Sequence, residues 1–102
     1  MIEDRMIEFG ELWPDRPTER WVRAIAEEAG EVVGAYNKWQ DDNKVVPKNR
    51  DDVLEEMSQL MGCVYCTAVK LGVSYHEFLD MVDGFLVRKA AQIRLIREKY
   101  DA

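Results

Sequence analysis

Residues 17–40 read PTERWVRAIAEEAGEVVGAYNKWQ, and this stretch decides the fold. Pro17 suits the first turn of a helix, where its fixed backbone angle is already helical and no N–H is needed. Beyond it, apolar residues recur every three or four positions, which is the spacing of one helix face, at Trp21, Ile25, Ala29, Val32, Tyr36 and Trp39. The pattern predicts a helix from about residue 17 to residue 39 or 40.

Two more stretches show the helical spacing, and no stretch alternates as a strand does. Gly72 is typical of the position after a helix, and Ser74 with Glu77 forms a capping box at the start of another. A polar loop is expected at residues 41–49. The further predicted helices cover residues 2–12, from about 49–52 to 72, and 74 to about 100. Residues 1–102 are therefore predicted to form one all-α domain, a four-helix bundle.

The composition excludes several partners. Fourteen Lys and Arg residues against twenty Asp and Glu residues give a net charge of −6, which repels nucleic-acid phosphates. The longest apolar run, residues 60–71, contains Lys70 and is too short to span a membrane. The first residues lack the apolar segment of a signal peptide. We expect a cytoplasmic protein with neither a nucleic-acid nor a membrane partner.

Acidic residues lie at matching places on two of the predicted helices. At about 100° per residue, Glu28 and Glu31 lie about 60° and 120° from the centre of the apolar face. Glu56 and Gln59 have the same offsets on the helix after the loop, and Asp52 lies one turn before Glu56 on the same edge. If these two helices pack antiparallel, the acidic edges meet.

Carboxylates that meet repel one another unless a cation neutralises them. Oxygen ligands without His or Cys suit Mg²⁺ or Mn²⁺ better than Zn²⁺. The ordinary alternative is that each acid is exposed and paired with Arg or Lys, which is the commonest environment of a glutamate. The residues alone leave both interpretations open.

The last predicted helix carries a cation within its apolar face. Lys89 lies among the apolar residues Phe78, Val82, Phe85, Ile93, Ile96 and Tyr100. A lysine at a core position is costly unless it is paired. Lys89 either extends its stem to the surface or faces the acidic cluster or a phosphate held there.

Two segments carry a family resemblance. AEEAGEV at residues 26–32, followed by LEEMSQL at residues 54–60, resembles the MazG-like all-α nucleoside triphosphate pyrophosphohydrolases. Their signature is EExxE, followed by ExxD on a neighbouring helix. The resemblance covers roughly residues 18–97. It implies a helical subunit that forms a homodimer or homotetramer and binds Mg²⁺. It also implies cleavage of a nucleotide between its α- and β-phosphates, giving the monophosphate and pyrophosphate.

The resemblance also assigns roles to residues of this chain. It implies that Glu28, Glu31 and Glu56 are metal ligands, with Glu27 as their partner in the motif. It implies that Lys89 lies near the phosphates. Glu27 or Glu31 is the best available general base.

Gln59 departs from this signature, because it stands where ExxD ends in aspartate. Its amide oxygen can still ligate Mg²⁺, but it carries no charge and cannot act as a base. Asp52 could supply the missing carboxylate from one turn away. Two functions stay open: hydrolysis of a (d)NTP, or nucleotide binding for sequestration or sensing. A purely structural helical adaptor is a third, and it predicts no dependence on metal.

The aromatic and sulfur-containing residues add three expectations. Trp13, in the proline-flanked break, is the best candidate for stacking on a nucleobase, while Trp21 and Trp39 are expected in the core or at a subunit interface. Cys63 and Cys66 lack the second pair or the nearby His of a zinc site, so we expect them to pack as small buried side chains. The wide apolar faces of three helices predict a homo-oligomer.

Overall fold

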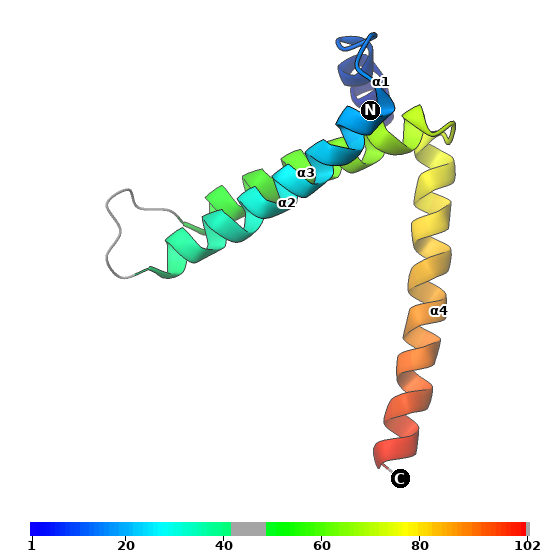
Figure 1. Cartoon of the computed structure of the whole chain (residues 1–102). Helices are drawn as coiled ribbons and strands as arrows, with labels where there is room; N and C mark the ends of the chain where they lie inside the picture. Colours follow the sequence, from blue (N-terminus) through cyan, green and yellow to red (C-terminus); the bar gives the residue numbers. More distant parts are fainter. Residues whose placement is uncertain (42–48, 102) are drawn as a thin grey trace.

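The computed structural model describes residues 1–41 and 49–101. Within these ranges the chain is all-α, with four helices and no strand, as predicted. The helices are α1 (Ile2–Glu11), α2 (Thr18–Gln40), α3 (Arg50–Lys70) and α4 (Tyr75–Asp101) (Figure 1). The predicted loop at residues 41–49 falls outside the described residues except for its two ends. None of the described helices combines the length and hydropathy needed to cross a lipid bilayer.

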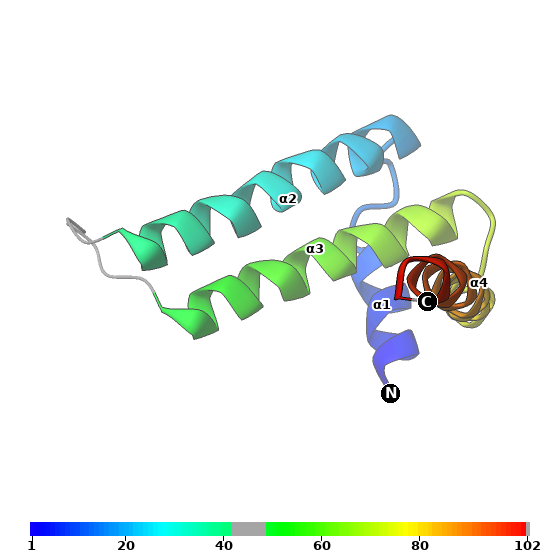
Figure 2. The same cartoon turned by 90° about the horizontal axis from the view of Figure 1, so that it is seen from below.

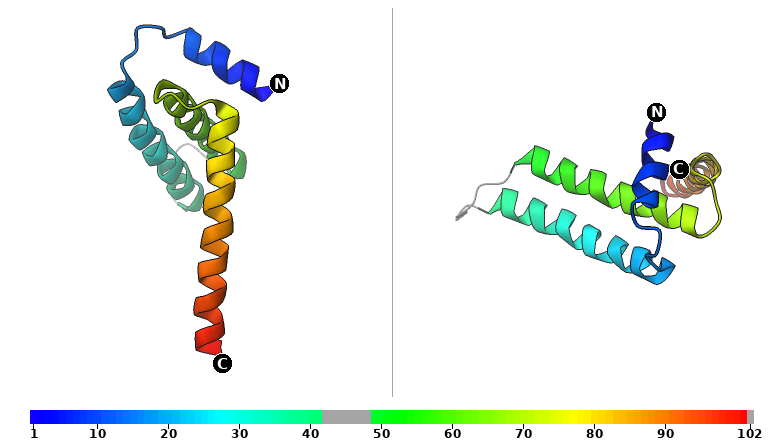
Figure 3. Two further views of the ribbon diagram at one scale, coloured as in Figure 1. Left: turned by 90° about the vertical axis from the view of Figure 1, so that its right-hand side faces the viewer. Right: turned by 90° about the horizontal axis from the view of Figure 1, so that it is seen from above.

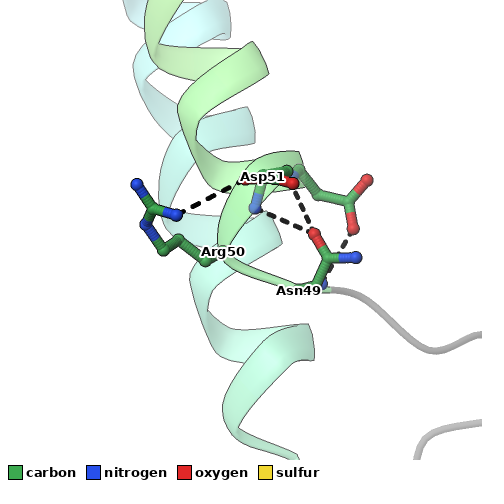
Figure 4. A network of polar contacts seen from close by, with 4 residues as sticks. Asn49, Arg50 and Asp51 are labelled. Carbon is green, nitrogen blue, oxygen red and sulfur yellow. Dashed lines mark hydrogen bonds and ion pairs between the residues drawn. The ribbon is translucent and has the colours of Figure 1, made fainter.

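Local sequence explains where α3 and α4 begin and where α3 ends. The Asn49 side chain accepts hydrogen bonds from the backbone N–H groups of Asp51 (2.8 Å) and Asp52 (3.2 Å) (Figure 4). The Asp52 carboxylate accepts one from the Asn49 N–H (2.8 Å), which completes a capping box. Gly72 follows α3 with a φ of 91°, a conformation that costs glycine little because it has no Cβ. Ser74 Oγ accepts the backbone N–H of Glu77 (3.1 Å), which is one of the two hydrogen bonds of the predicted capping box.

α2 and α3 form an antiparallel hairpin and pack along their lengths (Figures 1 and 2). Trp21 is fully buried near one end of this hairpin. Its ring meets Phe9 of α1 edge-on, with 6.1 Å between centroids, and the Arg16 guanidinium lies 4.3 Å from its centre. α1 also packs on α3, where Cys66 is buried with its Sγ 3.9 Å from the Met6 carbonyl oxygen. These contacts form the small core of the chain.

The contact between α2 and α3 is rotated by part of a turn from the centres of the predicted apolar faces. The pattern places Tyr36 in the core, yet this residue is 51% exposed, and Met57 and Met61 of α3 are 46% and 43% exposed. The buried residues of α2 are Trp21, Ala24 and Ala35. Small side chains let two helices approach closely, and their apolar stripes then turn partly away from the contact. The predicted core is therefore confirmed at Trp21 and Ala68, but the contact is rotated by part of a turn, which leaves Tyr36, Met57 and Met61 exposed.

α4 projects away from the hairpin (Figures 1 and 3). At the corner, Tyr65 of α3 meets Tyr75 and Phe78 edge-on, with 4.9 and 5.6 Å between ring centroids. No residue of α4 is buried. The Cα radius of gyration is 17.6 Å, whereas a compact chain of this length has about 13 Å. The four helices therefore do not form the predicted bundle within a single chain.

Candidate metal centre

Three glutamates converge in the middle of the α2–α3 hairpin. Glu28, Glu31 and Glu56 each present a carboxylate oxygen, and these three atoms lie within 4.8 Å of one another. Glu28 and Glu56 are half-buried, and Glu31 is exposed. The rotation that packs Ala24 and Ala35 against α3 also turns Glu28 and Glu31 towards it. The structure thus brings together the three acids that the sequence placed on matching edges.

The burial of the cluster suits a cation. Glu28 Oε2 has almost no accessible surface and accepts no hydrogen bond from a described residue, and Glu56 Oε2 is equally inaccessible. A carboxylate oxygen removed from water needs a positive partner or a donor. Around an octahedral Mg²⁺ the ligand oxygens lie about 3–4 Å apart. Three carboxylates at the observed spacing therefore fit a hard divalent cation after a small closure.

A hollow of about 580 Å³ opens beside the cluster, between α1 and α3. Glu28 is part of its wall, and α1 contributes Arg5, Met6 and Phe9. α3 contributes one face, with Glu55, Ser58, Gln59, Gly62 and Cys63. The hollow is therefore lined by apolar surface as well as by an amide, a hydroxyl and both signs of charge.

Sequence reasoning missed the α1 side of this hollow. Glu55 carries a signal that could have been found, because it precedes Gln59 by four residues and so shares its helix face. Arg5 and Phe9 carry no such signal in the sequence, because their position depends on how the residues between α1 and α2 direct α1 back onto α3.

Gln59 and Asp52 have different environments. Gln59 lines the hollow beside Glu28 and is exposed. Asp52 caps the start of α3 by accepting the Asn49 N–H. It is not among the described acids whose oxygens converge. The structure therefore does not bring Asp52 to the three glutamates, because its carboxylate serves the helix end.

Three other residues predicted for the site are not part of the converging group. Glu27 borders a second hollow, of about 370 Å³, together with the arginines Arg16, Arg20 and Arg23. Trp13 is half exposed and lines a further hollow at the break between α1 and α2. Lys89 is exposed on α4, which runs away from the hairpin (Figure 1). Glu27 is therefore not one of the three converging acids, and α4 carries Lys89 away from them.

The two thiols are poor nucleophiles. Burial raises the pKa of the Cys63 thiol, and the negative charge of Glu28 raises it further, although Arg16 acts in the opposite direction. Burial is also the main cause that raises the pKa of Cys66. Both thiols therefore stay protonated at neutral pH, and the nucleophilic form is the thiolate. Cys66 is buried and Cys63 half-buried, in keeping with the packing role predicted for them.

When the chain is compared with known proteins, no family model, no curated protein and no solved structure matches it.

Proposed function

We propose that this protein is a Mg²⁺-dependent nucleoside triphosphate pyrophosphohydrolase of the MazG-like kind. It would cleave a (d)NTP between the α- and β-phosphates, giving the monophosphate and pyrophosphate. The observation that carries the proposal is the convergence of Glu28, Glu31 and Glu56, with one oxygen of Glu28 withdrawn from water and from hydrogen bonds within the described residues. The EExxE spacing of the first of the two acidic helices supports it.

In this proposal each nearby side chain has a role. Glu28, Glu31 and Glu56 hold Mg²⁺ or Mn²⁺, whose chemistry would be to neutralise phosphate charge and to make a water more acidic. Glu31 is the better placed general base, because its carboxylate belongs to the converging cluster, whereas Glu27 borders the arginine-lined hollow. The hollow beside the cluster receives the nucleoside, with Phe9 as an apolar contact and the Gln59 amide as a hydrogen-bonding group.

A second candidate is nucleotide binding without hydrolysis, for sequestration or sensing. Gln59 favours it, because a neutral amide at this position lowers the negative charge available to a cation. Both candidates use the same cluster and the same hollow. They differ only in turnover.

We also propose that the chain forms a homodimer or homotetramer. It exposes 8209 Å² of surface, whereas a compact chain of its mass exposes about 6,000 Å². The excess of about 2,000 Å² per chain is more than enough for a stable interface.

Pyrophosphate release from a panel of (d)NTPs in millimolar Mg²⁺ tests the proposal. The wild type should release pyrophosphate, and EDTA or the Glu56→Gln substitution should abolish this release. Glu8→Gln is the matched control, because it removes the same charge from the exposed face of α1. Tight binding of a nucleotide without release would favour the second candidate. If the protein binds no nucleotide and is not stabilised by Mg²⁺, both candidates are contradicted and the helical adaptor remains.

A further inference from the structure

The arginine-lined hollow lies at the first turn of α2. It has a volume of about 370 Å³, and its wall consists of Arg16, Pro17, Glu19, Arg20, Arg23 and Glu27. That volume lies in the lower part of the range for small-molecule sites. The spacing of three residues places Arg20 and Arg23 on one edge of α2, shortly after Arg16. The hollow therefore gathers three guanidinium groups that do not belong to the glutamate cluster.

The positive charge of this hollow is only partly compensated within the described residues. Arg23 is paired with Glu19, with 2.6 Å between Nη2 and Oε1, whereas no ion pair joins Arg16 or Arg20 to another described residue. The Arg16 guanidinium instead lies 4.3 Å from the centre of the Trp21 ring, and its Nε is buried without a hydrogen-bond acceptor among the described residues. Guanidinium groups that line one hollow repel one another unless an anion lies between them.

The start of α2 adds to this positive field. Pro17 occupies the N-cap position, and no side chain caps the helix. α3 and α4 begin instead with Asn49 and Ser74, whose side chains accept backbone N–H groups. The free N–H groups of a first helical turn carry partial positive charge, which favours a bound anion. The arginines and the helix start therefore act in the same direction.

The chemistry of the hollow selects a small phosphoanion. Guanidinium groups bind phosphate through pairs of parallel hydrogen bonds, and three of them suit an anion with several charges. A nucleic acid is a poor ligand, because the chain carries a net charge of −6 and repels a long polyanion. Glu27 also lies in the wall, so an anion in the hollow has one carboxylate against it.

We propose that the arginine-lined hollow binds a diphosphate group without a metal ion, through Arg16, Arg20 and Arg23. The group belongs either to free pyrophosphate or to the terminal phosphates of a nucleotide. The anion site itself does not depend on the proposed hydrolysis, whereas a nucleotide as the source of the anion rests on that function.

The position of the hollow connects it with the glutamate cluster. Glu27 lies in the wall of the hollow, and the next residue, Glu28, belongs to the cluster. Along the helix axis Arg23 precedes Glu28 by about 7.5 Å. The charges of Arg16 and Glu28 both act on Cys63, whose pKa they shift in opposite directions. A nucleotide with its α-phosphate at the cluster would therefore extend its terminal phosphates towards the arginines, and pyrophosphate held there after cleavage would inhibit the reaction.

Calorimetric titration with pyrophosphate in EDTA and low salt tests the site without metal and without turnover. We expect the wild type to bind pyrophosphate with a Kd below about 1 mM. Arg20→Gln should weaken this binding about tenfold, because it removes a charge-assisted contact. Glu27→Gln should tighten it about threefold, because it removes a like charge from the wall. Arg94→Gln is the matched control, since it removes the same charge from exposed α4, outside the hollow, and circular dichroism checks that all variants keep their helix content.

A nucleoside triphosphate and a nucleoside monophosphate, titrated in EDTA into the wild type and Arg20→Gln, distinguish the two sources. Triphosphate binding that depends on Arg20 and is as tight as that of pyrophosphate assigns the site to a nucleotide, whereas tighter binding of pyrophosphate assigns it to the free anion. The proposal is overturned if pyrophosphate binds no tighter than about 1 mM, if the monophosphate binds as tightly, or if Arg20→Gln and Arg94→Gln weaken binding equally. Pyrophosphate binding in EDTA without release from any (d)NTP in Mg²⁺ would keep this inference and refute the hydrolase, and release without such binding would do the reverse.

Discussion

Replacing Glu28 by Gln should stabilise the metal-free protein. The Glu28 carboxylate has an oxygen within 4.8 Å of those of Glu31 and Glu56. Two unit charges at that separation repel by about 0.9 kcal/mol in water and by about 3.5 kcal/mol at an effective dielectric constant of 20. Because Glu31 is exposed, its repulsion with Glu28 lies near the lower value. Solvent and salt weaken the repulsion of Glu28 with Glu31 and with Glu56. We therefore expect Glu28→Gln to gain about 1–2 kcal/mol, which raises Tm by roughly 5–10 °C.

Mg²⁺ should reverse this order. At a concentration about 100 times its Kd, Mg²⁺ adds about 2.7 kcal/mol to a protein that binds it only when folded. The wild type should gain this stability, and Glu28→Gln should not. Differential scanning calorimetry in EDTA and then in Mg²⁺ measures both effects, with Glu8→Gln as the charge control. If the Glu28→Gln variant melts below the wild type without metal, or if Mg²⁺ stabilises both equally, the cluster is not a metal site.

The remaining predictions concern Gln59, Asp52, Cys63 and Trp21. Gln59→Asp should tighten Mg²⁺ binding about tenfold in calorimetric titration, whereas Asp52→Ala should leave it unchanged and cost about 1 kcal/mol in urea unfolding through loss of the capping box. Iodoacetamide should alkylate Cys63 slowly at pH 8 and faster in the Glu28→Gln variant, because removal of that negative charge lowers the thiol pKa. The free energy of unfolding should fall above about pH 9, because the thiol then ionises in the unfolded chain while its raised pKa keeps it protonated in the folded one. Trp21→Ala should cost about 3–5 kcal/mol in guanidinium unfolding, and a cost below about 1 kcal/mol would contradict its place in the core.

The helices were predictable because their signals are local. Apolar spacing located the three long helices, and Gly72 and Ser74 marked the turn between α3 and α4 within a residue of where it occurs. The partner of each apolar face was not predictable, since periodicity identifies a face without saying what covers it. The pattern therefore assigns Tyr36 and Met57 to the core of one chain, whereas α2 meets α3 through small residues such as Ala24.

The candidate site was also predictable from the sequence only in part. The meeting of Glu28 with Glu56 follows from their helical offsets, which are visible in the sequence, once α2 and α3 pack antiparallel as they do in the structure. Asp52 allows two interpretations, because the pattern Asn49-x-x-Asp52 of a capping box competes with the acidic edge. The contribution of Arg5 depends on a contact between distant parts of the chain, for which one sequence carries no signal.

The corner between α3 and α4 bears on how fast two copies assemble. Tyr65 holds Tyr75 and Phe78 by edge-on contacts, so the direction of α4 is set by rings of its own chain. In the proposed homo-oligomer, an interface that uses α4 would find this helix already oriented, because the entropy of orienting it is lost during folding. Two copies would then dock as preformed bodies, with an association rate constant in the usual range of about 10⁵–10⁷ M⁻¹ s⁻¹.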